Sequence, residues 1–198
     1  DLARREGRKS RLGLLFEIGF NDKILWRAGE LQAWKRYLAD NPRRRLIKER
    51  YPDLFTVKHH IDSYGYTFEA LGNTFLLDYP RRIFVQCSRR VSDADLDFLL
   101  RKAEPDFENK SVFVSASVSP GEKLVMRRAF KRGCPTIVLR ENGFAQYERP
   151  HGKAFDACAE GKLLLLAPWE HHTEKKLISR EQCLNLNRMA QAISTDRL

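Results

Sequence analysis

SVFVSASVSPGEKLVMRRAFKRG, residues 111–133, decides the fold class. Its apolar run Val112–Val114 predicts a buried strand. Ser119 is placed to cap a helix that starts with a proline, and Glu122 stands where a capping box requires an acid. Gly133 is placed to end that helix. A strand, a turn of small residues and a helix in this order predict one half of a βαβ unit.

The same alternation of strand and helix is expected on both sides of this segment. Strands are predicted at 83–85, 112–114, 136–139 and 163–166, and further helices at 92–103, 152–160 and 179–193. Apolar strands that alternate with helices are typical of an α/β fold with a parallel sheet. We therefore predict a Rossmann-like, doubly wound parallel sheet over residues 81–198.

The first 80 residues have a different pattern, and we predict that they form a separate domain. The expected elements are a helix over 30–38, a basic helical continuation that ends at Tyr51-Pro52, and strands at 55–61 and 66–77. Asn41-Pro42 is expected to interrupt the helix, because the residue before a proline disfavours the helical conformation. The two strands predict a small β-ribbon between the basic helical segment and the α/β domain.

The charge distribution favours a polyanionic partner. The chain has 36 Lys and Arg against 26 Asp and Glu, and residues 1–60 alone hold 15 against 8. Because this charge lies among aromatic residues, nucleic acid is favoured as the partner, with a merely solvated helix face as the alternative. The candidate DNA contacts are Trp34, Lys35, Arg36, Asn41, Arg43, Arg44, Arg45 and Lys48.

Cysteine usage and hydropathy point to a cytoplasmic protein. The four cysteines have no C-x-x-C spacing, which favours reduced thiols over a disulfide framework or a zinc site. No apolar run approaches the roughly 20 residues that span a bilayer, so no membrane association is expected. We predict no metal site within the chain.

Ligands of open parallel sheets bind at the carboxyl ends of the strands. The candidate nucleotide or phosphate contacts there are Ser88, Arg89, Ser117, Ser119, Gly121, Glu122, Asn142 and Gly143. The alternative is that these small and polar residues serve the geometry of the turns alone. Neither the dinucleotide fingerprint nor the P-loop spacing is present, so those two binding modes are not expected.

The order of these turns resembles the Rossmann-like domain of the DNA-processing protein A family, within the nucleotide-binding SLOG group. The matching segments are Ile83–Arg89 for a strand ending in Gly-Ser-Arg, Ser115–Glu122 for a Ser-Gly-Gly-Ala turn, Gly143–Pro150 for a Gly-Leu-Asp…Tyr-Pro loop, and Arg180–Met189 for an Arg-Asn-Arg helix. The resemblance implies a nucleotide site with Arg89, Glu122 and Arg188 at the ligand. Cys87, Ser117 and Val118 depart from the family pattern, because they replace small residues that let a backbone approach phosphate.

A second resemblance covers residues 12–50. Tyr37–Pro42 resembles the Tyr-x-x-x-Asn-Pro segment of the REP-associated tyrosine transposases. This implies that Tyr37 is a catalytic nucleophile that attacks a DNA phosphodiester, with Mg²⁺ held by a His-hydrophobic-His pair. His59-His60 and His171-His172 lack that spacing, so the pair is expected upstream of Asp1. The alternatives are a relative that kept only DNA binding, or a tyrosine that is simply half-buried on its helix.

Three functions are therefore open at this stage. The first is a DNA-binding protein of the mobile-element or DNA-processing sphere, with single-stranded or hairpin DNA as its partner. The second is a nucleotide-sensing or nucleotide-cleaving protein of the SLOG type. The third is a catalytically silent scaffold whose α/β domain pairs with itself as a homodimer.

Overall fold

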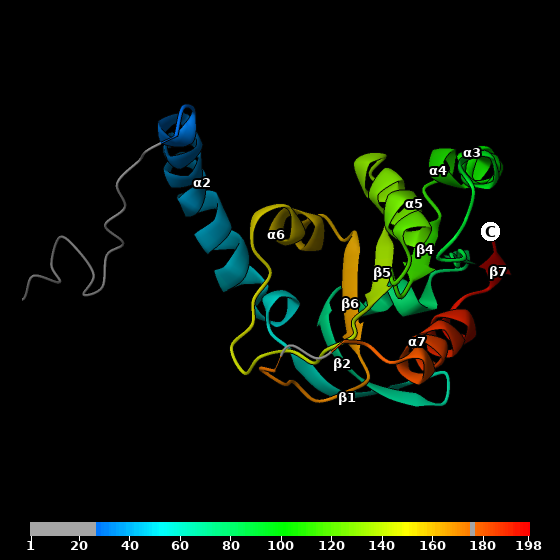
Figure 1. Ribbon diagram of the computed structural model, residues 1–198. Helices are drawn as coiled ribbons and strands as arrows, with labels where there is room; N and C mark the ends of the chain where they lie inside the picture. Colours follow the sequence, from blue (N-terminus) through cyan, green and yellow to red (C-terminus); the bar gives the residue numbers. More distant parts are fainter. Residues whose placement is uncertain (1–26, 175–176) are drawn as a thin grey trace, which may run out of the picture. The chain divides into compact units, whose positions relative to one another are not determined.

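The computed structural model describes residues 27–174 and 177–198 and shows one seven-stranded sheet flanked by helices (Figure 1). The strands are β1 (Lys58–Ser63), β2 (Tyr66–Gly72), β3 (Arg82–Phe84), β4 (Val112–Ser115), β5 (Thr136–Leu139), β6 (Leu163–Ala167) and β7 (Asp196–Arg197), in the spatial order β1-β2-β6-β5-β4-β3-β7. The helices are α2 (Glu30–Arg50), α3 (Asp93–Lys102), α4 (Glu104–Glu108), α5 (Pro120–Lys131), α6 (Gly152–Ala159) and α7 (Arg180–Ile193), with 3₁₀ turns at η2 (Pro52–Phe55) and η3 (Thr74–Asp78).

Helices cover both faces of the sheet, which confirms the doubly wound α/β prediction. Strands β3 to β6 are mutually parallel, and neighbouring residues along each strand face opposite sides. On β4, Phe113 packs in a core cluster with Val125 of α5, whereas Val114 packs in another with Leu186 of α7. Figure 1 shows α5 and α7 on opposite sides of the sheet. The buried apolar run that the sequence predicted thus contributes to two cores.

Helix α5 begins as the sequence predicts. The Ser119 hydroxyl accepts a hydrogen bond from the Glu122 backbone N–H at 3.2 Å, and the Glu122 carboxylate accepts one from the Ser119 N–H at 3.3 Å. Ser179 and Gln182 form the same reciprocal cap at the start of α7. Local capping residues therefore fix where both of these helices start.

The β1–β2 hairpin is the edge of the main sheet, so the prediction of a separate β-ribbon was wrong. Strand β2 pairs antiparallel with β6. The backbones of Gly72 and Leu163 lie close together where the hairpin joins the sheet. Gly72 has φ +106°, and a Cβ there would lie 2.3 Å from the Leu163 carbonyl oxygen. The Asn73 side chain donates to the same oxygen at 3.0 Å. The compact units divide between Arg45 and Leu46, which differs from the expected boundary at residue 80.

Helix α2 runs through Asn41-Pro42, so the predicted interruption was wrong. The Asp40 carboxylate accepts hydrogen bonds from Arg43 Nε at 2.6 Å and from Arg44 Nε at 2.5 Å. These bonds link the turns before and after the proline, which offsets the hydrogen bond that proline cannot donate. As predicted, the helix ends just before Tyr51. None of the helices in the described ranges is long and apolar enough to cross a membrane.

Some elements are shorter than predicted, and others were not predicted at all. The strand expected over 66–77 ends at Gly72 and is followed by η3, because Asn73 turns the chain. Helix α4 and strand β7 were missed. Strand β7 has two residues and no apolar pattern, and it pairs with β3 through Ile83 and Phe84.

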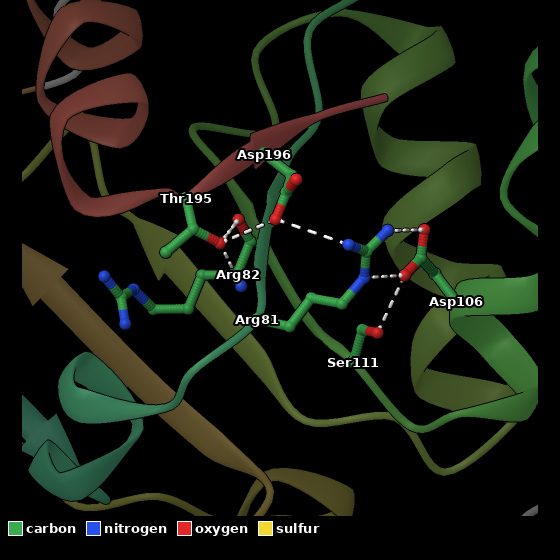
Figure 2. A network of polar contacts seen from close by, with 6 residues as sticks. All are labelled: Arg81, Arg82, Asp106, Ser111, Thr195 and Asp196. Carbon is green, nitrogen blue, oxygen red and sulfur yellow. Dashed lines mark hydrogen bonds and ion pairs between the residues drawn. The ribbon is translucent and has the colours of Figure 1, made fainter.

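A polar network holds β7 and α4 against the start of β3 (Figure 2). Arg81 Nε donates to Asp106 at 2.6 Å, and the Ser111 hydroxyl donates to the same carboxylate at 2.8 Å. Arg81 also forms an ion pair with β7, in which its Nη1 atom lies 3.5 Å from Oδ2 of Asp196. Burial by itself raises the pKa of Asp106, but hydrogen bonds from Arg81 and Ser111 outweigh it, so this pKa lies below its ordinary value.

We expect this carboxylate to make the fold acid-sensitive. Because the pKa of Asp106 is lower in the folded chain than in the unfolded chain, its stabilisation is present above about pH 4 and is lost as the pH falls further. Urea unfolding at a series of pH values measures the effect. An Asp106→Asn variant should be less stable at neutral pH and should lose less stability on acidification. Equal slopes in both proteins would contradict this assignment.

Candidate functional site

The loops that follow β3, β4, β5 and β6 lie along one edge of the sheet, as the sequence predicts for parallel strands. Nearly all the residues predicted to contact a nucleotide belong to these loops or to the helix starts beside them. The structure shows which of their polar groups are already engaged within the fold.

The β4–α5 loop is closed by its own hydrogen bonds. Ser117 has φ +51°, a strained conformation for a residue with a side chain, and its N–H donates to Ser115 Oγ at 2.9 Å. The Ser119 hydroxyl is occupied as the cap of α5. These two serines therefore hold the loop, and the hydroxyl of Ser119 is not directed at a ligand.

Glu122 occupies the place where a phosphate is expected at a helix start. Its side chain is buried, with 2% of the residue exposed. One carboxylate oxygen accepts from Cys87 N–H at 3.2 Å, and the other accepts from Val118 N–H at 2.8 Å and from Ser119 N–H. Backbone N–H groups at a helix start are the usual ligands of a bound phosphate. In this protein the N–H groups of Val118 and Ser119 instead donate to the carboxylate of Glu122.

Gly121 serves the packing of two loops. A Cβ at this position would lie 2.9 Å from Val91 and 3.0 Å from the Cβ of Cys87. The chain has Cys87 where the resembled family has a glycine, and the missing side chain of Gly121 leaves room for it. Burial, followed by the nearby Glu122 charge, raises the pKa of the Cys87 thiol.

Arg89 and Arg188 are both exposed, and Arg89 is tied to α7. One guanidinium nitrogen of Arg89 donates to Cys183 Sγ at 3.4 Å. Ser88 is also exposed, and its hydroxyl accepts from the Arg90 N–H. The structure thus brings Arg89 to the helix that carries Arg188. No contact of either arginine with Glu122 is seen among the described residues.

Asn142 and Gly143 join the loops that follow β5 and β6. The Asn142 side chain donates to the His172 carbonyl at 2.9 Å and accepts from the His172 N–H at 3.0 Å. A Cβ at Gly143 would lie within 2.6 Å of the backbone at Trp169–His171. Both predicted residues therefore have structural roles here.

A cavity of about 660 Å³ lies beside this junction. The chain leaves β5 toward α6 on one face and leaves β6 toward α7 on the other, so the junction is a topological switch point. The described lining residues include Glu141, Glu174 and Leu177, whereas Lys175 and Lys176 lie outside the described residues.

Helix α2 presents the predicted DNA-contacting side chains. It holds seven basic and three acidic residues, and none of its residues is buried. Trp34 and Tyr37 form an edge-to-face pair with ring centroids 5.6 Å apart, and Tyr37 is 50% exposed. Hydrogen bonds from Arg43 and Arg44 hold the pKa of Asp40 well below its ordinary value.

The remaining predicted residues of α2 differ in their surroundings. Lys35, Arg36 and Arg45 are exposed and Asn41 is half-buried. The Lys48 ammonium lies 5.4 Å above the ring of Phe155, in a cation–π contact. Residues 12–26 of the transposase-like segment lie outside the described residues.

The described histidines do not gather into a metal centre. Nδ1 of His59 lies 2.8 Å from Oε1 of Glu69. His60 has φ +56° and lies at an irregularity in the β1–β2 pairing. Within residues 27–174 and 177–198, no three His, Cys, Asp or Glu side chains form a group that could hold a metal ion.

Sequence reasoning missed a groove of about 490 Å³ between α5 and α6. Basic side chains line it, and three of them, Lys123, Arg127 and Lys131, recur every fourth residue along α5. That spacing, which places side chains on one helix face, was the available signal.

Comparisons with known proteins support the fold and leave the family open. No family model matches the chain, and no curated protein matches it. A solved structure of DNA processing protein A from Helicobacter pylori, described for its single-stranded DNA binding mode, is similar with a TM-score of 0.51 and 18% identity. The similarity covers 72% of this chain and 67% of that one. It bears out the predicted Rossmann-like architecture.

Proposed function

We propose that this protein binds DNA, and that α2 supplies part of the binding surface. The observation that carries the proposal is a helix of 21 residues that buries none of them and has seven basic residues against three acidic ones. Such a surface attracts phosphates without sequence preference. The fold shared with a protein described as binding single-stranded DNA supports the same choice.

The aromatic residues of α2 favour single-stranded DNA as the partner. Trp34 is half-buried and Tyr37 is half-exposed, so part of the surface of this pair is accessible to a base. Stacking of unpaired bases on aromatic rings is the common device of proteins that bind single strands. In this proposal Lys35 and Arg36 contact the backbone beside the stacked base.

Strand cleavage by Tyr37 remains a separate hypothesis. The resembled transposases imply a metal held by a His-hydrophobic-His pair, and His59-His60 and His171-His172 lack that spacing. Cleavage of the kind that those transposases perform would need such a pair in addition to the described residues. Binding requires no such addition, and it is therefore the function we propose for this chain.

Nucleotide binding at the carboxyl edge of the sheet is the weaker candidate. The β4–α5 loop would offer its N–H groups to a phosphate, but Glu122 already accepts from Val118 and Ser119. This buried carboxylate opposes an anionic ligand at the β4–α5 loop.

Neutralising the arginine triplet should weaken DNA binding. We expect an Arg43→Gln, Arg44→Gln, Arg45→Gln variant to bind a labelled oligothymidine about tenfold more weakly at about 50 mM salt. The slope of log affinity against log salt should fall by about 2, since each lost phosphate contact removes about 0.7. Fluorescence anisotropy over a salt series measures both quantities.

The matched control removes three charges elsewhere. Arg101, Lys102 and Arg149 are exposed and lie outside α2. Their simultaneous change to glutamine, referred to below as the control variant, lowers the net charge equally. If it weakens binding as much as the triplet variant does, net charge alone explains the effect and α2 is not the site.

A further inference from the structure

The groove between α5 and α6 combines cationic walls with an apolar floor. Lys123, Arg127 and Lys131 lie along its α5 side, and Lys153 stands on the α6 side. All four are exposed. The described lining residues include no Asp or Glu. A polyanion would meet attraction along the whole length of this groove.

These four cations form none of the ion pairs described for residues 27–174 and 177–198. Lys153 is the one of the four that also lines an adjoining smaller hollow, so the three cations of α5 carry most of the argument. Asp156 and Glu160 line that hollow, where Glu160 pairs with Lys162 at 2.8 Å. The positive charge of Lys123, Arg127 and Lys131 on the α5 wall is therefore available to a partner.

The floor is suited to a flat apolar group. Met126 is 6% exposed, and the half-buried Phe130 lines both the groove and the adjoining hollow. Bases of a single strand combine a π-face with a phosphate backbone, whereas a duplex keeps its bases stacked inside. A volume of about 490 Å³ is in the range of pockets that hold small ligands, so the groove admits unpaired nucleotides.

We propose that this groove binds unpaired nucleotides of a DNA strand, with bases against Met126 and Phe130 and phosphates on the cationic walls. Ser117, in the β4–α5 loop, also lines the groove, which therefore reaches the carboxyl edge of the sheet. The inference rests on the proposed DNA binding and assigns it a second surface, distinct from α2.

The test compares single-stranded with double-stranded DNA. We expect a Lys123→Gln, Arg127→Gln, Lys131→Gln variant to bind oligothymidine about tenfold more weakly at low salt, with a salt slope smaller by about 2. Its affinity for a hairpin duplex should change no more than that of the control variant. A Phe130→Leu variant, which keeps an apolar side chain but removes the ring, should weaken only the single-stranded complex.

Photo-crosslinking locates the contact directly. Oligonucleotides with bromodeoxyuridine should crosslink to the peptide that holds Met126 and Phe130. Crosslinks confined to α2, or an equal loss for single strands and duplex, would overturn the groove proposal and leave DNA binding intact. No DNA binding by the unaltered protein would overturn both. A mononucleotide that shifts the melting temperature and competes as strongly as the oligonucleotide would identify a free nucleotide as the ligand and overturn the strand proposal.

Discussion

Replacing Glu122 with alanine is expected to lower the free energy of unfolding by about 3 kcal/mol, because buried backbone N–H groups lose their acceptor. The carboxylate now accepts from Cys87, Val118 and Ser119. For a chain of this size the change corresponds to a fall in Tm of roughly 6–12 °C. Urea unfolding followed by circular dichroism gives the free energy.

Two further variants separate this effect from a general loss of helix capping. Glu122→Gln keeps one acceptor oxygen but turns an NH₂ group toward an N–H, so its stability should lie between those of the alanine variant and the unaltered protein. Glu181 also stands in the first turn of its helix but is exposed, so Glu181→Ala should change little. Equal effects at Glu122 and Glu181 would contradict the role that we assign to the buried carboxylate.

The same variant tests whether Glu122 stands in for an external anion. Once the carboxylate is removed, the vacated N–H groups form a site of the kind that binds phosphate at helix starts. Inorganic phosphate should therefore stabilise Glu122→Ala more than it stabilises the unaltered protein at the same ionic strength. Identical stabilisation of both proteins would show that the loop does not act as an anion site.

Replacing Arg82 with leucine is expected to lower the free energy of unfolding by about 2–3 kcal/mol. Arg82 is 6% exposed, and its guanidinium donates to the Ile193 carbonyl at 2.6 Å, to the Tyr79 carbonyl and to the Tyr64 hydroxyl at 2.7 Å. One side chain thus joins the tip of the hairpin, the end of η3 and the end of α7. The apolar replacement avoids burying a charge, which limits the loss.

Hydrogen exchange gives this prediction a local measurement. The amides of Thr195 and Leu198 donate to β3 carbonyls beside Arg82. They should exchange faster in Arg82→Leu, while amides of β5 change in proportion to global stability. Arg82→Lys should be intermediate, since an ammonium cannot reproduce the fork of a guanidinium. An Arg101→Leu variant, altered at an exposed site, serves as the control.

The sequence predicted the α/β architecture where local signals decide the structure. Val112–Val114 formed a buried strand and Ser119 a capping box, because apolar runs and capping residues act over a few positions. Strand β7 could not be predicted in this way. Its Asp196 and Arg197 are exposed, and only pairing with a strand more than 100 residues earlier makes them a strand.

The candidate site was predicted less well than the fold, for a physical reason. A glutamate at the third position of a helix indicates a cap, but nothing in the sequence shows that Cys87 will also donate to it. The same residue types serve either ligand binding or loop closure. The predicted helix break at Pro42 was wrong for a similar reason. The Asp40 carboxylate accepts hydrogen bonds from both Arg43 and Arg44, across the position of the expected break.

The pairing of β3 with β7 has a consequence for synthesis on the ribosome. Arg82 and Thr195 are 113 positions apart, so the outer side of β3 has no partner until nearly all the intervening chain has emerged. A nascent strand with a bare edge invites association with other chains. Because β3 is only three residues long, its unpaired edge offers few backbone groups to another chain. Late completion of the sheet therefore carries less risk of misassembly on polysomes.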